Sequence, residues 1–372
     1  ASDIHIEATS QGLAIKYRLD GVISQMGAVS EKPLAEQVIS RVKVMSDLDI
    51  TETRTPQDGR FRAVYRAREI DFRVSVMPSV HGEDIVIRVL DKQSLSDHVS
   101  GLSLESLGFD ESVKSIMRKH FLSPYGMVLV TGPTGSGKTT SLYAALHEIN
   151  HGHDKIITIE DPVEYQLSGI LQIPVNEKKG LTFARGLRSI LRHDPDKIMV
   201  GEIRDSETAQ IAVQSALTGH LVFTTVHANN VFDVIGRFLN MDVDPYSFVS
   251  ALNIVIAQRL IRTVCQHCFV AVKVDDDYIE RVGLTPPNNA KVIQAKGCGE
   301  CRGTGYKGRR AVAEVLCLDD ELRELIASRA PIRQIKAHAS KKGTRLLRDA
   351  ALEMAWRGET TIEEVNRVST MA

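Results

Sequence analysis

The stretch "VLVTGPTGSGKTTSLYAAL", residues 128–146, decides the fold. It fits the template G-x-x-x-x-G-K-[ST], between an apolar strand-like run and a helix-like run. Glycines in such a loop let backbone N–H groups converge on an anion, and the helix that follows presents its positive end. We predict that the loop binds a nucleoside triphosphate, ATP, through Gly132, Pro133, Thr134, Gly135, Ser136, Gly137, Lys138, Thr139 and Thr140. The alternative is a chance glycine-rich turn.

Two side chains of this loop have expected tasks. Lys138 is expected to reach the β- and γ-phosphates, and the Thr139 hydroxyl is expected to bind Mg²⁺. Phosphate binding alone does not separate kinases, helicases, switches and motors, so the rest of the chain has to make that distinction.

Three further apolar runs, "IITIED", "IMVGE" and "LVFTTVH", end in groups that can orient water or contact phosphate. These groups are Glu160, Glu202 and His227, with Asp161 and Glu164 close to the first. Strands that alternate with helices predict a parallel sheet covered by helices on both faces, and ligands bind beyond the carboxyl ends of such strands. The sequence therefore predicts a hydrolytic site there. The alternative is that these side chains cap helices or lie at exposed strand ends.

One position departs from the usual pattern of phosphate-loop proteins. The second strand of such a site commonly ends in Asp, which supports Mg²⁺. Here Gly201 takes that place and Glu202 follows. We expect Mg²⁺ to be held by Thr139, the phosphates and water, and Glu202 to act on the attacking water.

Composition sets limits on the class of protein. The 372 residues are 43% hydrophobic and 25% charged, which is typical of a globular protein of two or three domains. No run approaches the roughly 18 apolar residues that span a bilayer, and no secretory signal is visible. A net charge of −1 provides no global attraction to nucleic acid or anionic lipid. The opening "ASDIHIEA" lacks Met, so we expect a longer protein whose preceding segment carries a docking surface.

The chain divides by pattern into two domains. Residues 1–100 predict a small α/β domain, with a hairpin turning at Asp20-Gly21 and a helix over 33–49. That helix is expected to bury Leu34, Val38, Val42 and Met45. The polar segment 91–108 is the expected linker, and residues 101–372 the second domain, with helices over Thr182–His193, Ser206–Thr218 and the region 319–372.

Four of the five cysteines form two C-x-x-C pairs. Cys265, Cys268, Cys298 and Cys301 have 29 residues between the pairs, within a predicted subdomain at 262–312. All-thiolate ligation predicts a closed structural zinc site. A redox pair and an iron–sulfur cluster are the alternatives. His267 is expected to face solvent, and Cys317 to be a buried small hydrophobic residue.

Four motifs resemble, in order and spacing, those of the type II/type IV secretion ATPases. They are "GPTGSGKTT", "ITIEDPVEY", "LRHDPDKIMVGEIRD" and "TGHLVFTTVHAN", the Walker A, Asp box, Walker B and His box motifs of that family. The glycine before the Walker B glutamate is a family trait. "SDIHIE", "RLDGVI", "PQDGRF" and "FRVSVMP" extend the resemblance over essentially the whole chain. The tetracysteine motif favours the assembly ATPases of type II secretion and type IV pili over the pilus-retraction ATPases.

The resemblance implies an α/β fold: a small PAS-like α/β domain, then a RecA-like P-loop ATPase domain with a zinc-binding tetracysteine insertion and C-terminal helices. It implies that Glu160 and Glu202 are catalytic carboxylates. His227, with His220, is implied to sense the γ-phosphate, and arginines complete the site in a hexameric ring. The candidates by motif position are Arg60, Arg73, Arg185, Arg188 and Arg204; for each, a solvated charge or a structural ion pair is the alternative.

The implied function is ATP hydrolysis that drives assembly of a pseudopilus or pilus, from the cytoplasmic face of the bacterial inner membrane. The implied partners are an inner-membrane platform protein and the cytoplasmic domain of a membrane assembly protein, with no direct contact to nucleic acid. A DNA-uptake or conjugation motor of the same superfamily is one alternative. A zinc-containing regulatory module with little hydrolysis is another.

Overall fold

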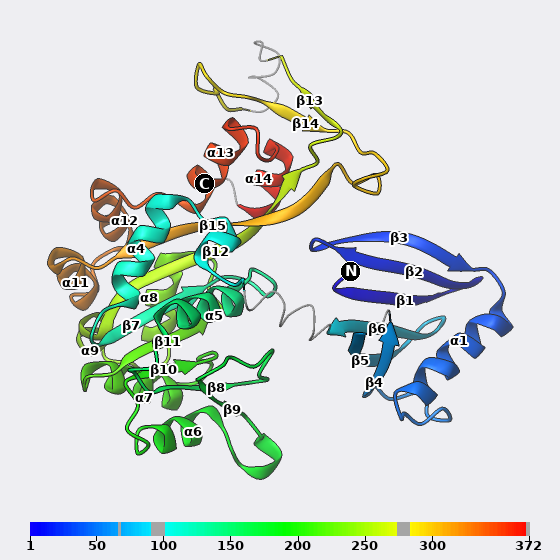
Figure 1. The fold of residues 1–372 in the computed structure, drawn as a ribbon, viewed down its shortest axis with the longest axis horizontal. Helices are drawn as coiled ribbons and strands as arrows, with labels where there is room; N and C mark the ends of the chain where they lie inside the picture. Colours follow the sequence, from blue (N-terminus) through cyan, green and yellow to red (C-terminus); the bar gives the residue numbers. More distant parts are fainter. Residues whose placement is uncertain (66–67, 91–100, 274–282, 370–372) are drawn as a thin grey trace. The chain divides into compact units, whose positions relative to one another are not determined.

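The structure is a computed structural model that describes residues 1–65, 68–90, 101–273 and 283–369 (Figure 1). The chain separates into two compact units, residues 1–100 and 101–372. Of the expected linker, residues 91–100 lie outside the described part. Its remainder contains α3 (Leu104–Leu107), which begins in a capping box at Ser103.

The first unit is an antiparallel six-stranded sheet with one helix. Its strands lie in the order β3-β2-β1-β6-β5-β4. The predicted turn is confirmed: Asp20 and Gly21 both have positive φ, as a two-residue hairpin requires. The elements are β1 (Asp3–Thr9), β2 (Gly12–Leu19), β3 (Val22–Val29), α1 (Lys32–Met45), β4 (Gln57–Tyr65), β5 (Arg68–Ser79) and β6 (Gly82–Leu90).

The buried face of α1 differs from the prediction at both ends. Val38 and Val42 pack against the core of the sheet as expected, but Leu34 and Met45 are 45% and 40% exposed. A charged residue, Lys43, is buried on this face instead. Its Nζ lies 2.8 Å from a carboxylate oxygen of Glu83 and 2.7 Å from the Glu52 carbonyl oxygen. Because this pairing compensates the charge, Lys43 can occupy a core position that apolar periodicity assigns to its neighbours.

The second unit is built on a seven-stranded sheet in the order β15-β12-β7-β11-β10-β8-β9. The four strands expected from apolar runs are confirmed, and all four run parallel. At one edge of the sheet, β15 runs antiparallel to β12. The strands are β7 (Gly126–Thr131), β8 (Ile156–Glu160), β9 (Leu171–Pro174), β10 (Lys197–Val200), β11 (Leu221–Val226), β12 (Leu252–Val264) and β15 (Tyr306–Cys317).

Helices cover both faces of this sheet. All six residues of β7 are buried, and Met127 and Leu129 pack in one core cluster with Ala209 and Ala212 of α7. Helix α7 begins at Ser206 as predicted, because the Asp205 side chain accepts a hydrogen bond from the Thr208 N–H and caps it. The helices here are α4 (Glu111–Phe121), α5 (Lys138–Ile149), α6 (Phe183–Ile190), α7 (Ser206–Leu217), α8 (Val231–Leu239) and α9 (Pro245–Ala251).

The described residues between β12 and β15, 265–273 and 283–305, form an arm that carries the four paired cysteines. This arm includes the two-stranded sheet of β13 (Phe269–Ala271) and β14 (Ile293–Ala295). The helices predicted for the region 319–372 follow β15. They are α11 (Asp320–Ala327), α12 (Ile332–Lys341), α13 (Leu347–Trp356) and α14 (Ile362–Val368). No helix in the described ranges has both the length and the apolar character needed to cross a bilayer.

Candidate active site and metal centre

The phosphate loop joins the end of β7 to the start of α5. Gly137 is the residue before the helix and has a φ of 86°, in the left-handed region. Gly132 has a φ of 149°, and a Cβ there would lie 2.5 Å from the carbonyl oxygen of Gln258. A Cβ at Gly137 would lie 2.9 Å from Nε2 of Gln258. Both the backbone conformation and the limited space therefore favour glycine at these two positions.

Gln258 on β12 bonds to the phosphate loop, and no motif in the sequence predicts this role. Its side chain is 1% exposed, donates from Nε2 to the Ser136 carbonyl oxygen at 2.9 Å and accepts from the Ser141 hydroxyl at 2.8 Å. These bonds fix the carbonyl side of the loop, so that its N–H groups remain available. The one available signal was a polar residue inside the apolar run "LNIVIAQRL".

Lys138 begins α5 and folds back over the loop. Its Nζ donates to the carbonyl oxygens of Gly132 at 2.9 Å and Pro133 at 3.1 Å. Burial lowers the pKa of Lys138; the negative charge of Glu202 opposes this effect and the positive charge of Arg259 adds to it. The ammonium group is partly desolvated and bonded to two carbonyl oxygens. Phosphate oxygens can replace these carbonyl oxygens as its hydrogen-bond acceptors.

The carboxylate of Glu202 contacts two other predicted site residues, His227 and Arg204. Its Oε2 lies 3.2 Å from Nε2 of His227, and its Oε1 accepts from the Arg204 guanidinium. A Cβ at Gly201 would approach the carbonyl oxygen of Ile159 to 3.3 Å, so a longer side chain would crowd the backbone of β8. The glycine that precedes Glu202 thus lets β10 end tightly against its neighbour.

Glu160 lies in a separate hydrogen-bond network. Its carboxylate is 2% exposed and accepts from the hydroxyls of Tyr143 and Thr158, and from Nε2 of Gln172 at 3.1 Å. Burial and the nearby charge of Glu160 raise the pKa of Tyr143, so the phenol stays protonated as a donor. Three donors hold Glu160 in one orientation at the end of β8.

His220 lies away from the phosphate loop and from Glu202 and His227. It precedes the first residue of β11, and its backbone carbonyl accepts from Gly126 at the start of β7. That end is the amino-terminal edge of the sheet, whereas the phosphate loop lies at the carboxyl edge. The His220 ring instead contacts the Ser215 carbonyl oxygen at 3.0 Å. The expectation that His220 senses the γ-phosphate is therefore corrected, because the length of β11 separates it from the loop of the same chain.

The remaining arginine candidates lie apart from the loop or in the first unit. Arg188 pairs with Glu207 at 2.6 Å between two exposed side chains, and Arg185 donates to the Gly180 carbonyl oxygen at 3.2 Å. Arg60 and Arg73 face each other across β4 and β5 and line one hollow of about 770 Å³. Across the described ranges, neither of these two guanidinium groups has an ion-pair partner.

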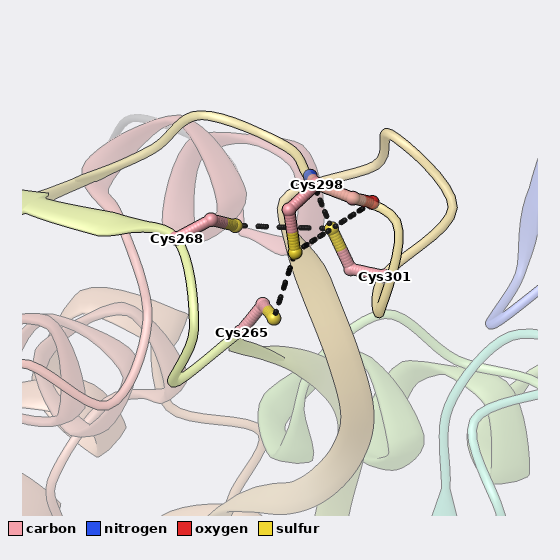
Figure 2. A group of neighbouring side chains, drawn as sticks. All are labelled: Cys265, Cys268, Cys298 and Cys301. Carbon is pink, nitrogen blue, oxygen red and sulfur yellow. Dashed lines mark hydrogen bonds between the residues drawn. The ribbon is translucent and has the colours of Figure 1, made fainter.

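The four paired cysteines converge at the base of the arm (Figure 2). Their sulfur atoms lie 3.9 Å apart for Cys265 and Cys298, 3.8 Å for Cys268 and Cys301, and 3.7 Å for Cys298 and Cys301. A tetrahedral site with zinc–sulfur bonds of about 2.3 Å has sulfur–sulfur edges of about 3.8 Å. The four thiols therefore fit a tetrahedral metal ion.

The surroundings of this cluster also suit thiolate ligands. Burial opposes ionisation of Cys301, yet backbone N–H groups of Cys298 and Gly305 donate to its sulfur, each at 3.1 Å, and lower the pKa of the thiol. His267 is exposed as predicted. The prediction for Cys317 is wrong: it is exposed, because Leu316 beside it on β15 takes the core-facing position.

Comparison with known proteins identifies relatives along the whole chain. The type II secretion system protein E of Pseudomonas aeruginosa is 44% identical over 369 residues, which cover 99% of this chain and 72% of that protein. The type II secretion system ATPase E of Vibrio cholerae is 45% identical over the same length, with the same coverage. The type IV pilus assembly ATPase PilB of Thermus thermophilus is 45% identical over 367 residues, 98% of this chain and 41% of that protein.

Solved structures share the fold. The pilus retraction motor PilT with bound ADP has a TM-score of 0.63 at 24% identity, covering 100% of this chain and 94% of that one. The ATPase DotB of Legionella pneumophila has a TM-score of 0.69 at 19% identity, covering 99% and 91%. The family described as type II/IV secretion system protein matches residues 1–367. This chain therefore belongs to the type II/IV secretion system protein family.

Proposed function

We propose that this protein hydrolyses ATP to drive assembly of a pseudopilus or pilus. Its family and its relatives make it a secretion or pilus motor ATPase. The observation that carries hydrolysis is the meeting of three strand ends: Lys138 after β7, Glu202 after β10 and His227 after β11. A protein that only binds nucleotide has no need of a carboxylate and an imidazole held beside the loop lysine.

Each residue of this group has a task in the proposed reaction. The N–H groups of the loop and the start of α5 bind the phosphates, and Lys138 offsets their negative charge. Glu202 accepts a hydrogen bond from the attacking water, with Arg204 and His227 holding its carboxylate. The exposed Thr139 hydroxyl is the ligand this chain offers to Mg²⁺, which neutralises phosphate charge when bound. Glu160, oriented by three donors, is the second carboxylate.

We propose that the motor forms a ring of several copies and holds a metal ion in each copy. Members of this family typically work as hexamers with membrane machinery. We propose that Arg60 and Arg73 serve the nucleotide of a neighbouring copy, since they face one hollow without ion-pair partners among the described residues. The ring would act at the cytoplasmic face of the inner membrane, on a platform protein and a membrane assembly protein. The four cysteines would hold zinc as a structural ion.

The Glu202→Gln variant tests hydrolysis directly. It keeps the size and one acceptor of the side chain but removes its charge. We expect kcat for phosphate release to fall by about 100-fold or more, with ATP affinity largely retained. The control is Glu36→Gln, an exposed glutamate on α1 of the other unit. Unchanged turnover in Glu202→Gln would reject the hydrolytic site and favour a nucleotide-dependent regulatory module.

A further inference from the structure

Arg259 lies beside the phosphate loop and is absent from the motifs that identify the family. It follows Ala257 by two residues on β12, and Ala257 pairs with Thr131 at the end of β7. A Cβ at Gly132, the first loop residue, would lie 3.2 Å from Nη1 of Arg259. The guanidinium is thus at the carboxyl edge of the sheet, where the phosphates are expected.

Among the described residues, the hydrogen-bond partners of the Arg259 guanidinium are carbonyl oxygens. Nη1 donates to the Gln258 carbonyl oxygen at 3.1 Å, and Nη2 donates to that of Asn229 at 2.8 Å. Within the described parts of the chain, no carboxylate forms an ion pair with it. Arg262, three residues further along β12, has a carboxylate partner: it pairs with the buried side chain of Glu364 at 2.7 Å.

Arg259 is also placed beside another cation. It is half-buried, and burial lowers its pKa, with the charge of Glu314 opposing that effect. The positive charge of Arg259 in turn lowers the pKa of Lys138. Both cations are partly desolvated and repel each other, and each donates hydrogen bonds to carbonyl oxygens. Such an arrangement is costly until an anion lies between them, because a desolvated charge needs a counter-charge.

We propose that Arg259 binds the phosphates of ATP in its own chain, as a second cation beside Lys138. This inference rests on the proposed triphosphate site at residues 132–140. The hydrogen bond to the Asn229 carbonyl is the one that phosphate would replace. Asn229 follows His227 by two residues, and Asn230 caps α8 through the N–H groups of Phe232 and Asp233. Phosphate binding therefore frees the segment that carries His227 from its tie to β12.

The test compares three variants by calorimetric titration with ADP and with a non-hydrolysable ATP analogue. Arg259→Gln is expected to weaken binding of both by about 10- to 100-fold, the loss of a charge-assisted hydrogen bond. Arg259→Lys keeps the charge and is expected to recover part of the affinity. Lys138→Ala tests the underlying site: if it binds both ligands like the parent, the phosphate-loop proposal fails.

Arg323→Gln is the matched control. Arg323 is likewise a half-buried arginine that donates to two backbone carbonyl oxygens, those of Val249 and Leu252. It belongs to α11, and Leu252 is the first residue of β12, at the end of the strand away from the phosphate loop. Arg323→Gln is expected to lower the melting temperature without changing affinity. If Lys138→Ala loses binding while Arg259→Gln binds like the parent, the role of Arg259 is wrong. A second result would also contradict this role. In that result, the loss of affinity in Arg259→Gln is explained by a lower free energy of unfolding, and Arg259→Lys recovers no affinity.

Discussion

Single residues decide how the phosphate loop is held. Gln258 places one side-chain amide between the Ser136 carbonyl and the Ser141 hydroxyl, all within a buried layer. Gly201 lets the end of β10 approach the backbone of β8. Neither residue touches the expected position of the phosphates, yet both set the geometry of those that do. Motifs indicate which residues react, whereas these two residues determine where the reacting groups lie.

Gln258→Leu is expected to loosen the loop. The substitution keeps the volume of the side chain but leaves a buried carbonyl and a buried hydroxyl without partners, at a cost of about 1–3 kcal/mol for each. The free energy of unfolding should fall, and ATP affinity with it, as measured by denaturant titration and calorimetry. Gln214→Leu on the exposed face of α7 is the control. Parent-like stability and affinity in Gln258→Leu would contradict the bracing role.

At the scale of elements, the pair β12 and β15 joins the site to the metal centre. Beyond the end of β12 the chain turns into the arm, and the first cysteine follows Val264 directly. The same strand carries Gln258 under the phosphate loop. Two backbone N–H groups donate to the sulfur of Cys301, and the N–H of Cys268 donates to the Cys265 carbonyl oxygen in a local turn.

Metal analysis tests the arm as an element. The purified protein is expected to contain about one zinc per chain, because four cysteine sulfurs lie on the edges of a tetrahedral site. Cys298→Ser should lose the zinc and expose the arm to protease cleavage. Cys317→Ser, which changes an exposed cysteine outside the cluster, should keep it. Iron in place of zinc, or no metal at all, would reject the zinc assignment.

At the scale of the whole molecule, the two units carry complementary parts of one proposed reaction. The second unit holds the loop, Glu202 and His227. The first unit presents Arg60 and Arg73 side by side, where like charges on facing strands are unfavourable without an anion. In a ring, the copies can supply these arginines to one another, which is why the proposed activity belongs to the assembly.

Mixing two inactive variants tests this arrangement. Arg73→Gln and Lys138→Ala should each lose ATPase activity, the first by about 100-fold or more if the arginine stabilises the transferring phosphoryl group. Rings formed from both variants should regain activity, because some sites combine an intact loop with an intact arginine from another copy. Arg54→Gln, whose side chain is 89% exposed in the same unit, should remain active alone. Absence of recovery in mixed rings would assign the arginines to their own chain.

The sequence alone was sufficient for the motifs, the four central strands, the family and the cysteine cluster. Each of these depends on local spacing or on strong apolar periodicity, which neighbours in the chain determine. The tertiary structure decided three other matters: the removal of His220 from the site, the exposure of Leu34 and Cys317, and the gathering of Gln258 and Arg259 beneath the loop. These depend on which strand lies beside which, and Gln258 is about 120 residues from Ser136 along the chain. Residues this far apart share no periodic pattern, so only the folded sheet brings them together.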